Sequence, residues 1–264
     1  MDSPAGRSAE TRTANVKLSI GGNSIEMQLS VPAGPVRPAQ LLPVLQSLTN
    51  AVVEIATDAV EAEGKRISCQ AGCGACCRQL VPISEVEAGH IAELVENLPE
   101  PRRSEIRARF AEAEERIAAA GMLEGLSNTQ SLEEGGLQAL GMDYFRLGIP
   151  CPFLEQESCS IHPDRPLSCR EYLVTSPAEH CREPSAATID QVPIPVKISR
   201  GLLRFELSAG QRVVDWVPLS LAPRWAKSHP PGPPRYAGPE LVQEIFQHLT
   251  GQNTAPAESP RNDS

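Results

Sequence analysis

The sequence predicts an α+β fold: a mainly helical cysteine-cluster domain with an N-terminal β-hairpin and a small C-terminal antiparallel β element. Three observations support this. Apolar residues alternate with polar ones near the N-terminus, recur every three or four residues through the middle, and alternate again after Cys181. At 264 residues the chain is long enough to bury a core without cross-links.

The β-hairpin is expected over residues 15–36. Two alternating stretches, residues 16–20 and 25–31, flank the sequence Gly-Gly-Asn at residues 21–23, where glycine suits the positive φ angles of a tight turn. Residues 1–14 are polar, and we expect them to be disordered.

The central domain is expected over residues 37–182. Within it Ser84 and Glu87 form a capping-box signature, which marks the start of a helix. The spacing of apolar residues predicts four helices, over residues 39–63, 84–98, 101–120 and about 132–140.

The C-terminal part, residues 183–250, is expected to hold β strands and a terminal helix. Alternating apolar residues predict strands over residues 192–198, 202–207 and 213–217, with a turn at 209–211. A helix with one apolar face is expected over residues 239–249. The polar tail, residues 251–264, is expected to be disordered.

The eight cysteines fall into two groups, and all eight are candidate metal ligands. The first group is Cys69, Cys73, Cys76 and Cys77, and the second is Cys151, Cys159, Cys169 and Cys181. Thiols this dense usually hold metal in a chain without a secretion signal. Glycines on both sides of Cys73 permit a tight curl, so we expect the two groups to converge on a shared centre. Cys181 stands apart from the others and is equally well explained as a small core residue.

The spacing favours an iron–sulfur cluster, expected to be of the [4Fe–4S] type, over zinc. Zinc sites favour two separated CxxC pairs, and no such pair repeats here. Zinc stays open because tetrahedral thiolate ligation suits both. A disulfide framework is disfavoured by chain length and by the absence of a signal stretch. Cys69-x3-Cys73-x2-Cys76 also has the spacing of the radical-SAM cluster loop, but no run of βα units for a barrel is visible.

Charge and hydropathy restrict the partners and the compartment. A net charge of −9 opposes nonspecific binding to nucleic acid, which needs a basic surface. No apolar run of about 18 residues occurs, so no membrane span is expected. The N-terminus has no apolar stretch typical of a secretory signal, and we therefore expect a cytoplasmic protein. An unknown protein partner stays open.

The strings CQAGCGACC, residues 69–77, and CPFLEQESCSIHPDRPLSCREY, residues 151–172, resemble the YkgJ-type cysteine-cluster family. That family is described as zinc- or iron-chelating, and its pattern is C-x3-C-x2-CC, then CxFL, then C-x-I-(Y/H)-x2-RP-x2-CR. The resemblance covers about residues 66–182. Here His162 stands where many relatives carry tyrosine, and we expect it to be a surface turn residue rather than a ligand.

The resemblance implies metal binding and leaves two other functions open. One relative, the flagellin lysine methylase, is an iron–sulfur-dependent enzyme, so a protein-modifying enzyme that uses S-adenosylmethionine is one alternative. A zinc-stapled interaction module is the other. The sequence names no catalytic residue, since it lacks a glycine-rich phosphate loop, a triad motif and an HExxH helix.

Two arginines of the second motif are candidate cofactor-binding residues. Arg165 and Arg170 could offset the negative charge of a thiolate-ligated cluster or bind an anionic substrate. Equally, they could form structural hydrogen bonds to loop carbonyls and to Glu171. Phe153 and Ile161 are expected to pack over the site and to exclude water.

Overall fold

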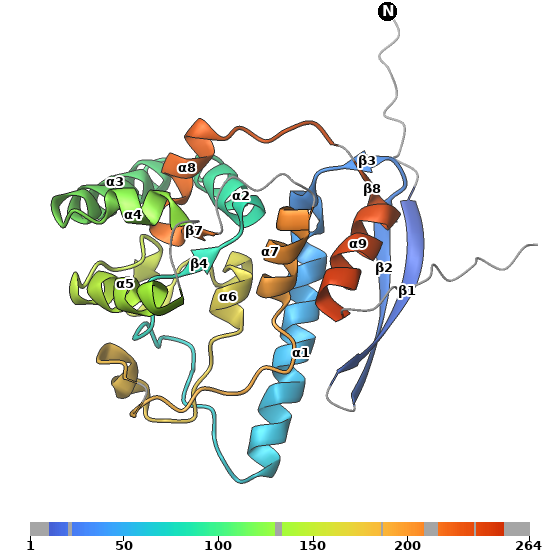
Figure 1. Cartoon of the computed structure of the whole chain (residues 1–264), viewed down its shortest axis with the longest axis horizontal. Helices are drawn as coiled ribbons and strands as arrows, with labels where there is room; N and C mark the ends of the chain where they lie inside the picture. The colour runs from blue at the N-terminus through green and yellow to red at the C-terminus, as the bar shows by residue number, and fades with distance from the viewer. Residues whose placement is uncertain are drawn as a thin grey trace, which may run out of the picture.

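The computed structural model describes residues 11–20, 23–129, 134–185, 187–208, 216–234 and 236–250, and it is mainly helical. The described helices are α1 (Leu42–Ala62), α2 (Glu85–Glu96), α3 (Arg102–Ala119), α4 (Leu123–Ser127), α5 (Glu134–Arg146), α6 (Leu167–Arg170), α7 (Ile198–Ser208), α8 (Ala222–Ser228) and α9 (Gly238–Thr250). The long helix α1 stands between a β-hairpin with α9 on one side and the α2–α5 helices on the other (Figure 1).

The strands in the described residues form four antiparallel pairs. The long pair is β1 (Thr11–Ile20) with β2 (Asn23–Pro32), and it confirms the predicted N-terminal hairpin. The other pairs have two residues in each strand: β3 (Pro35–Val36) with β8 (Tyr236–Ala237), β4 (Pro82–Ile83) with β7 (Val217–Pro218), and β5 (Leu154–Glu155) with β6 (Ser158–Cys159). The β3–β8 and β4–β7 ladders join segments that are remote in sequence, so the C-terminal part packs against the earlier part of the chain.

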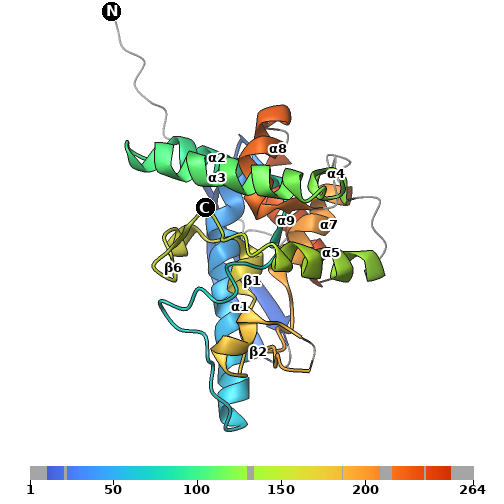
Figure 2. The ribbon, with the colours of Figure 1, turned by 90° about the vertical axis from the view of Figure 1, so that its left-hand side faces the viewer.

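Two main apolar cores hold the molecule together. One packs the hairpin, α1, α6, α7 and α9, with Leu48, Val52 and Leu167 fully buried between them. The other packs α2 and α3 against Phe153 and the chain that leads into α8. Figure 2 shows α2 and α3 lying across the upper end of α1. Because α6 contributes to the first core and Phe153 to the second, the cysteine-bearing segment is anchored on both sides.

The α+β class is confirmed, but the strand predicted over residues 202–207 is wrong, since these residues belong to α7. Ile198, Leu202 and Phe205 recur at helical spacing and are fully buried against the first core. Arginines lie between them and stay exposed. Leu203, Phe205 and Leu207 also fit an alternating pattern, so periodicity alone could not decide between helix and strand.

Other boundaries also differ from the predictions. Residues 192–197 form no strand; the nearest pairing is a single bridge between Gln191 and Val174. The short helix predicted near residues 132–140 runs from Glu134 to Arg146 as α5. Of the strand predicted over 213–217, only residues 216 and 217 are described; Val217 lies in β7, and Trp216 directly precedes it. The turn predicted at residues 209–211 lies outside the described residues.

The two predicted disordered ends are only partly covered by the structure. Residues 11–14 belong to β1, so the prediction is wrong for them. Residues 1–10 and the tail 251–264 lie outside the described residues. Among the described helices, none combines the length and the apolar character needed to cross a membrane.

The last helix docks on the N-terminal hairpin through a glycine. Gly238 donates its backbone N–H to the carbonyl of Gly34 at 3.2 Å. A Cβ atom at position 238 would lie 2.2 Å from the carbonyl oxygen of Pro32 and 3.1 Å from Cβ of Val31. Only glycine permits this close approach of helix and strand.

We expect Gly238→Ala to destabilise the protein by about 1–3 kcal/mol, because the new methyl group meets backbone that cannot rotate away. The measurement is denaturant unfolding followed by circular dichroism. Gly89→Ala in α2 is the matched control, since a Cβ atom there meets nothing within 4 Å. The control should be neutral or should stabilise by up to about 1 kcal/mol. Equal effects of the two substitutions would contradict the prediction.

A buried carboxylate from α7 caps the start of α2. The Glu206 side chain is 4 % exposed and accepts hydrogen bonds from the backbone N–H of Val86 at 3.0 Å and of Glu85 at 3.3 Å. Burial raises the pKa of Glu206 from its ordinary 4.5 to about 8, although the two donors act in the opposite direction. Between these two pKa values Glu206 therefore keeps its proton in the folded protein and releases it in the unfolded chain.

This raised pKa predicts that stability falls as the pH rises between about 5 and 8, by up to ~1.4 kcal/mol per pH unit. The free energy of unfolding of Glu206→Gln should vary less over this range than that of the wild type. Glu93→Gln removes the same charge from an exposed position of α2 and should leave the wild-type slope unchanged. Parallel pH profiles for the wild type and Glu206→Gln would refute the assignment.

Candidate metal centre

The first cysteine group lies in a loop between α1 and β4 that curls through successive turns. The backbone N–H of Cys73 bonds the carbonyl of Gln70 at 3.1 Å, and that of Cys77 bonds the carbonyl of Gly74 at 3.0 Å. Gly72 has a φ of +82° between them, a conformation that glycine adopts without strain. The tight curl predicted from the sequence is therefore present.

The second group starts in a small hairpin made of β5 and β6. Leu154 pairs with Cys159, and the turn between the strands places Gln156 and Glu157 at positive φ angles of 48° and 59°. Two such residues form the turn type that matches the twist of a two-residue hairpin. The turn brings Cys159 back beside Cys151, from which the hairpin departs.

Two carboxylates of this hairpin tie it to the rest of the protein. Glu155 accepts from Arg102 at 2.6 Å and from Arg109 at 2.8 Å, both on α3. Glu157 forms a two-point pair with Arg78 of the first cysteine loop, at 2.6 and 3.1 Å. These pairs could not be predicted from local sequence patterns, because their members are 46 to 79 residues apart.

The two cysteine groups meet directly. The backbone N–H of Cys151 donates to the carbonyl of Cys77 at 2.7 Å. Next to this bond, a Cβ atom at Gly74 would lie 2.5 Å from the Leu154 side chain and 2.9 Å from the carbonyl oxygen of Glu157. The segments that carry the two cysteine groups therefore contact each other.

The opposite end of the first loop contacts a third segment, which carries Cys181. Ser68 donates its backbone N–H to the carbonyl of Val174 at 2.9 Å. Cys69 and Cys73 pack against the buried residues Val174 and Cys181, the latter only 3 % exposed. Cys181, the one cysteine also explained as a lone core residue, thus lies beside two cysteines of the first group.

Cys169 lies on the short helix α6, which a buried carboxylate holds in place. One oxygen of Glu87 accepts from the backbone N–H of Leu167 at 2.8 Å, and the other accepts from that of Ser84 at 3.0 Å. Glu87 therefore closes the predicted capping box of α2 and also positions the start of α6. The sequence indicated only the first of these two roles.

The thiols lie within electrostatic reach of one another. Burial raises the pKa of five cysteine thiols, and the charge of the Cys76 thiolate would raise it further. The five are Cys69, Cys151, Cys159, Cys169 and Cys181. The pKa of Cys151 rises to about 12 and that of Cys181 to about 11. A hydrogen bond to the Cys77 thiol, and then burial, raises the pKa of Cys76 itself. A bound cation would relieve this mutual repulsion and displace the protons.

Three sulfur atoms face backbone N–H donors, which favour the thiolate and partly oppose the effect of burial on the pKa. The donors are Val174 for Cys69, Phe153 for Cys151 and Ile161 for Cys159. In the last two pairs the donor is two residues after the cysteine. Hydrogen bonds of this kind orient metal-binding sulfur atoms and tune the metal.

The two arginines of the second motif have different surroundings. Arg170 is 5 % exposed and donates to the carbonyls of Arg165 and Pro163 and to the side chain of Asn50 on α1. Three of its donor contacts are thus structural. Arg165 instead has a buried Nε atom without a hydrogen-bond partner among the described residues. Its positive charge opposes the burial-induced rise in the pKa of Cys69 and Cys159.

The remaining motif residues take the predicted places. Phe153 and Ile161 are 1 % and 6 % exposed and pack with Cys151 and Cys159 in the second core. His162 lies exposed in a 3-10 turn. Apolar side chains therefore cover one side of the hairpin that carries these two cysteines.

The donor set fits a thiophilic metal. All eight cysteines are free thiols. As the side chains stand, no three His, Cys, Asp or Glu residues in the described part of the chain are close enough together to hold a metal ion. Rotation about a cysteine Cα–Cβ bond moves the sulfur by about 3 Å, so a change of rotamer alters the spacing of the thiols without a change of the backbone. The unpartnered Arg165 Nε is a further point of fit, since a thiolate-ligated centre is anionic.

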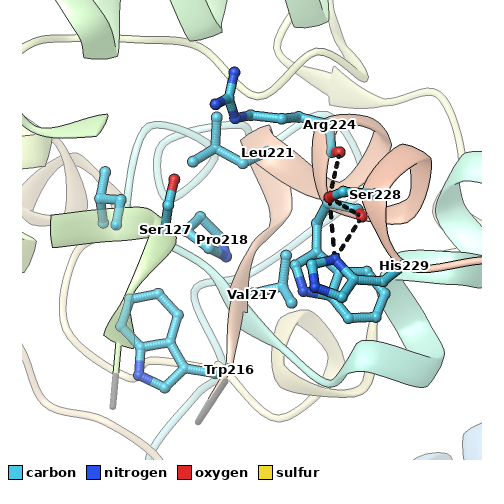
Figure 3. A pocket seen from close by; sticks show the side chains of 10 residues that line it. Ser127, Trp216, Val217, Pro218, Leu221, Arg224, Ser228 and His229 are labelled. Atoms are coloured by element: carbon cyan, nitrogen blue, oxygen red, sulfur yellow. Dashed lines mark hydrogen bonds between the residues drawn. The ribbon is translucent and has the colours of Figure 1, made fainter. Parts of the chain in front are cut away.

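A separate cavity of about 160 Å³ lies between α4, β7 and α8, and no cysteine lines it (Figure 3). Trp216, Leu221 and Ser127 form part of its wall. Trp225 stacks on His229 with ring centroids 4.6 Å apart, and the His229 ring also contacts the carbonyl oxygen of Trp225 at 3.0 Å. The cavity therefore does not belong to the cysteine site.

We expect Glu87→Gln to destabilise the protein by about 1–3 kcal/mol, because the amide nitrogen cannot accept from Ser84 or Leu167 and one buried donor loses its partner. The measurement is denaturant unfolding of the metal-free protein. Glu93→Gln, at an exposed position on the same helix, should change stability by less than about 0.5 kcal/mol. A Glu87→Gln variant as stable as this control would argue against the positioning role.

Comparison with known proteins gives one match. The model of the CxxCxxCC family, described as "Putative zinc- or iron-chelating domain", matches residues 68–186. No curated protein and no solved structure matches the chain. The match spans both cysteine groups and every contact between them described above. Residues 68–186, less than half of the chain, are therefore similar to a family described as zinc- or iron-chelating.

Proposed function

We propose that the domain binds an iron–sulfur cluster through thiolates from both cysteine groups. The observation that supports this best is the direct contact between the groups, the 2.7 Å hydrogen bond from Cys151 to Cys77 beside the close approach at Gly74. Segments 74 residues apart are held so that their thiols share one region. Such an arrangement is typical of a metal centre whose ligands link segments that are distant in the sequence.

The surroundings of the thiols suit a cluster. Phe153 and Ile161 exclude water from one side, which stabilises a cluster and tunes its potential. Backbone N–H groups face the sulfur atoms of Cys151 and Cys159. Hydrogen bonds to sulfur and limited solvent access are the means by which proteins set cluster potentials.

Iron–sulfur is preferred to zinc on the form of the ligand set. Structural zinc sites usually draw their ligands from two separated pairs. Here the first loop carries four cysteines at uneven spacing, and the donors from the rest of the chain come from a hairpin, a short helix and a further loop. The family description leaves both metals open, so the metal content decides between them.

The test is anaerobic purification followed by analysis of iron, acid-labile sulfide and zinc and by visible spectroscopy. We expect a coloured protein with iron and sulfide in equal amounts and an absorption that bleaches on reduction. Cys151→Ser should be clearly less coloured than the wild type, because it removes a donor at the junction of the two groups. Gly89→Ala should keep the wild-type spectrum.

A colourless protein with stoichiometric zinc and no sulfide would contradict the iron–sulfur proposal and would favour a zinc centre built from the same thiols. A protein without either metal after anaerobic purification and reconstitution would contradict metal binding as a whole. Loss of colour in Gly89→Ala as well as in Cys151→Ser would show that general instability caused the loss.

A further inference from the structure

The first cysteine loop contacts two different parts of the chain, one at each end. Near Cys77 it bonds the segment that carries Cys151 and the β5–β6 hairpin. Near Cys69 it bonds the segment at Val174, which leads to Cys181. The loop therefore bridges two regions that each contain cysteines.

Packing divides the cysteines in the same way. Cys69, Cys73 and Cys181 share one small cluster, with Ala75 and Val174 buried among them. Cys151 and Cys159 pack in a different and larger core, which contains Phe153 and Ile161. The two sets thus have separate apolar surroundings.

Cys169 belongs with the second of these sets. Glu87 fixes the start of its helix, and Ser168 next to it donates to the carbonyl of Pro82 at 2.9 Å. Burial, followed by negative charge on Cys151, Cys76 and Cys159, raises the pKa of Cys169. Cys69 and Cys73 of the first loop are thus grouped with Cys181, and Cys169 with Cys151 and Cys159, which leaves Cys76 and Cys77.

We propose that the domain holds two metal centres, each with four cysteine ligands. Cys69, Cys73 and Cys181 supply three ligands of one centre, and Cys151, Cys159 and Cys169 supply three of the other. The adjacent Cys76 and Cys77 supply the fourth ligand of each. This inference rests on the proposed binding of metal by thiolates, and it holds for zinc ions as for iron–sulfur clusters.

Coordination number supports two centres over one. Structural zinc and [4Fe–4S] clusters each take four protein ligands. One such centre would leave four free thiols in a confined region, whereas two use all eight. The thiols of the adjacent Cys76 and Cys77 hydrogen-bond to each other, so the two sulfur atoms lie side by side and can ligate two neighbouring centres, one each.

Charge also favours a pair of adjacent centres beside Arg165. Four thiolates around each metal make both centres anionic, and their repulsion needs a cation nearby. The buried Nε of Arg165 has no partner among the described residues. The positive charge of Arg165 acts on Cys69 of the first set, on Cys159 of the second and on Cys76 between them. Arg165 thus lies where its positive charge can offset the negative charge of both proposed centres.

The test is titration of the metal-free full-length chain with Co²⁺, followed by the sulfur-to-cobalt charge-transfer absorption, with native mass spectrometry as the independent count. The wild type should bind two equivalents. Cys181→Ala and Cys159→Ala should each bind one tightly, and the double variant should bind none. Alanine is chosen because it keeps a small apolar side chain at the buried Cys181 and the partly buried Cys159. Ile189→Val alters packing beside Cys181 without removing a sulfur and should bind two.

A wild type that saturates at one equivalent would overturn the inference, and so would Cys181→Ala that still binds two, since Cys181 would then be a packing residue. No Co²⁺ binding by the wild type would overturn thiolate metal binding itself, a separate failure. Circular dichroism shows whether a variant folds. If Cys181→Ala does not fold, the mass-spectrometric count on the wild type still decides between one centre and two.

Discussion

The close approach of the first cysteine loop to the β5–β6 hairpin is the constraint on which the site depends. Gly74 has no side chain, so the carbonyl of Glu157 and the Leu154 side chain come within distances that a Cβ atom would forbid. This lets Cys77 accept its hydrogen bond from Cys151 at 2.7 Å. If the loop moved outward by the width of a methyl group, the two groups of thiols would lose their common region.

The groups that hold this approach in place differ in importance. The pairs Arg78–Glu157 and Arg102–Glu155 are roughly one third exposed, so each contributes at most about 1 kcal/mol and mainly orients the hairpin. Glu87 is different, because its carboxylate is buried and holds two backbone donors that have no other partner. The geometry around Cys169 therefore depends more on Glu87 than on the visible ion pairs.

Local signals in the sequence predicted much of the fold and the ligand candidates. The hairpin, α1 and the capping box of α2 each follow from periodicity or from a short motif, and the cysteine spacing indicated convergence. Helix α7 was missed because its apolar residues fit both the helical and the strand period. The contact at Gly74 and the second role of Glu87 link residues 80 or more apart, and a single sequence carries no information on such pairs.

The region around Cys69 and Cys181 shows why metal matters for this fold. Its apolar cluster contains only Ala75, Val174 and Cys181 as buried members, far fewer than the cores around α1 and α3. So little buried apolar surface cannot by itself offset the conformational entropy of ordering the loops that meet there. Small segments of this kind usually gain their stability from disulfides or metal, and the cysteines here are free. Metal coordination would thus stabilise the region around Cys69 and Cys181, as the apolar cores stabilise the rest of the molecule.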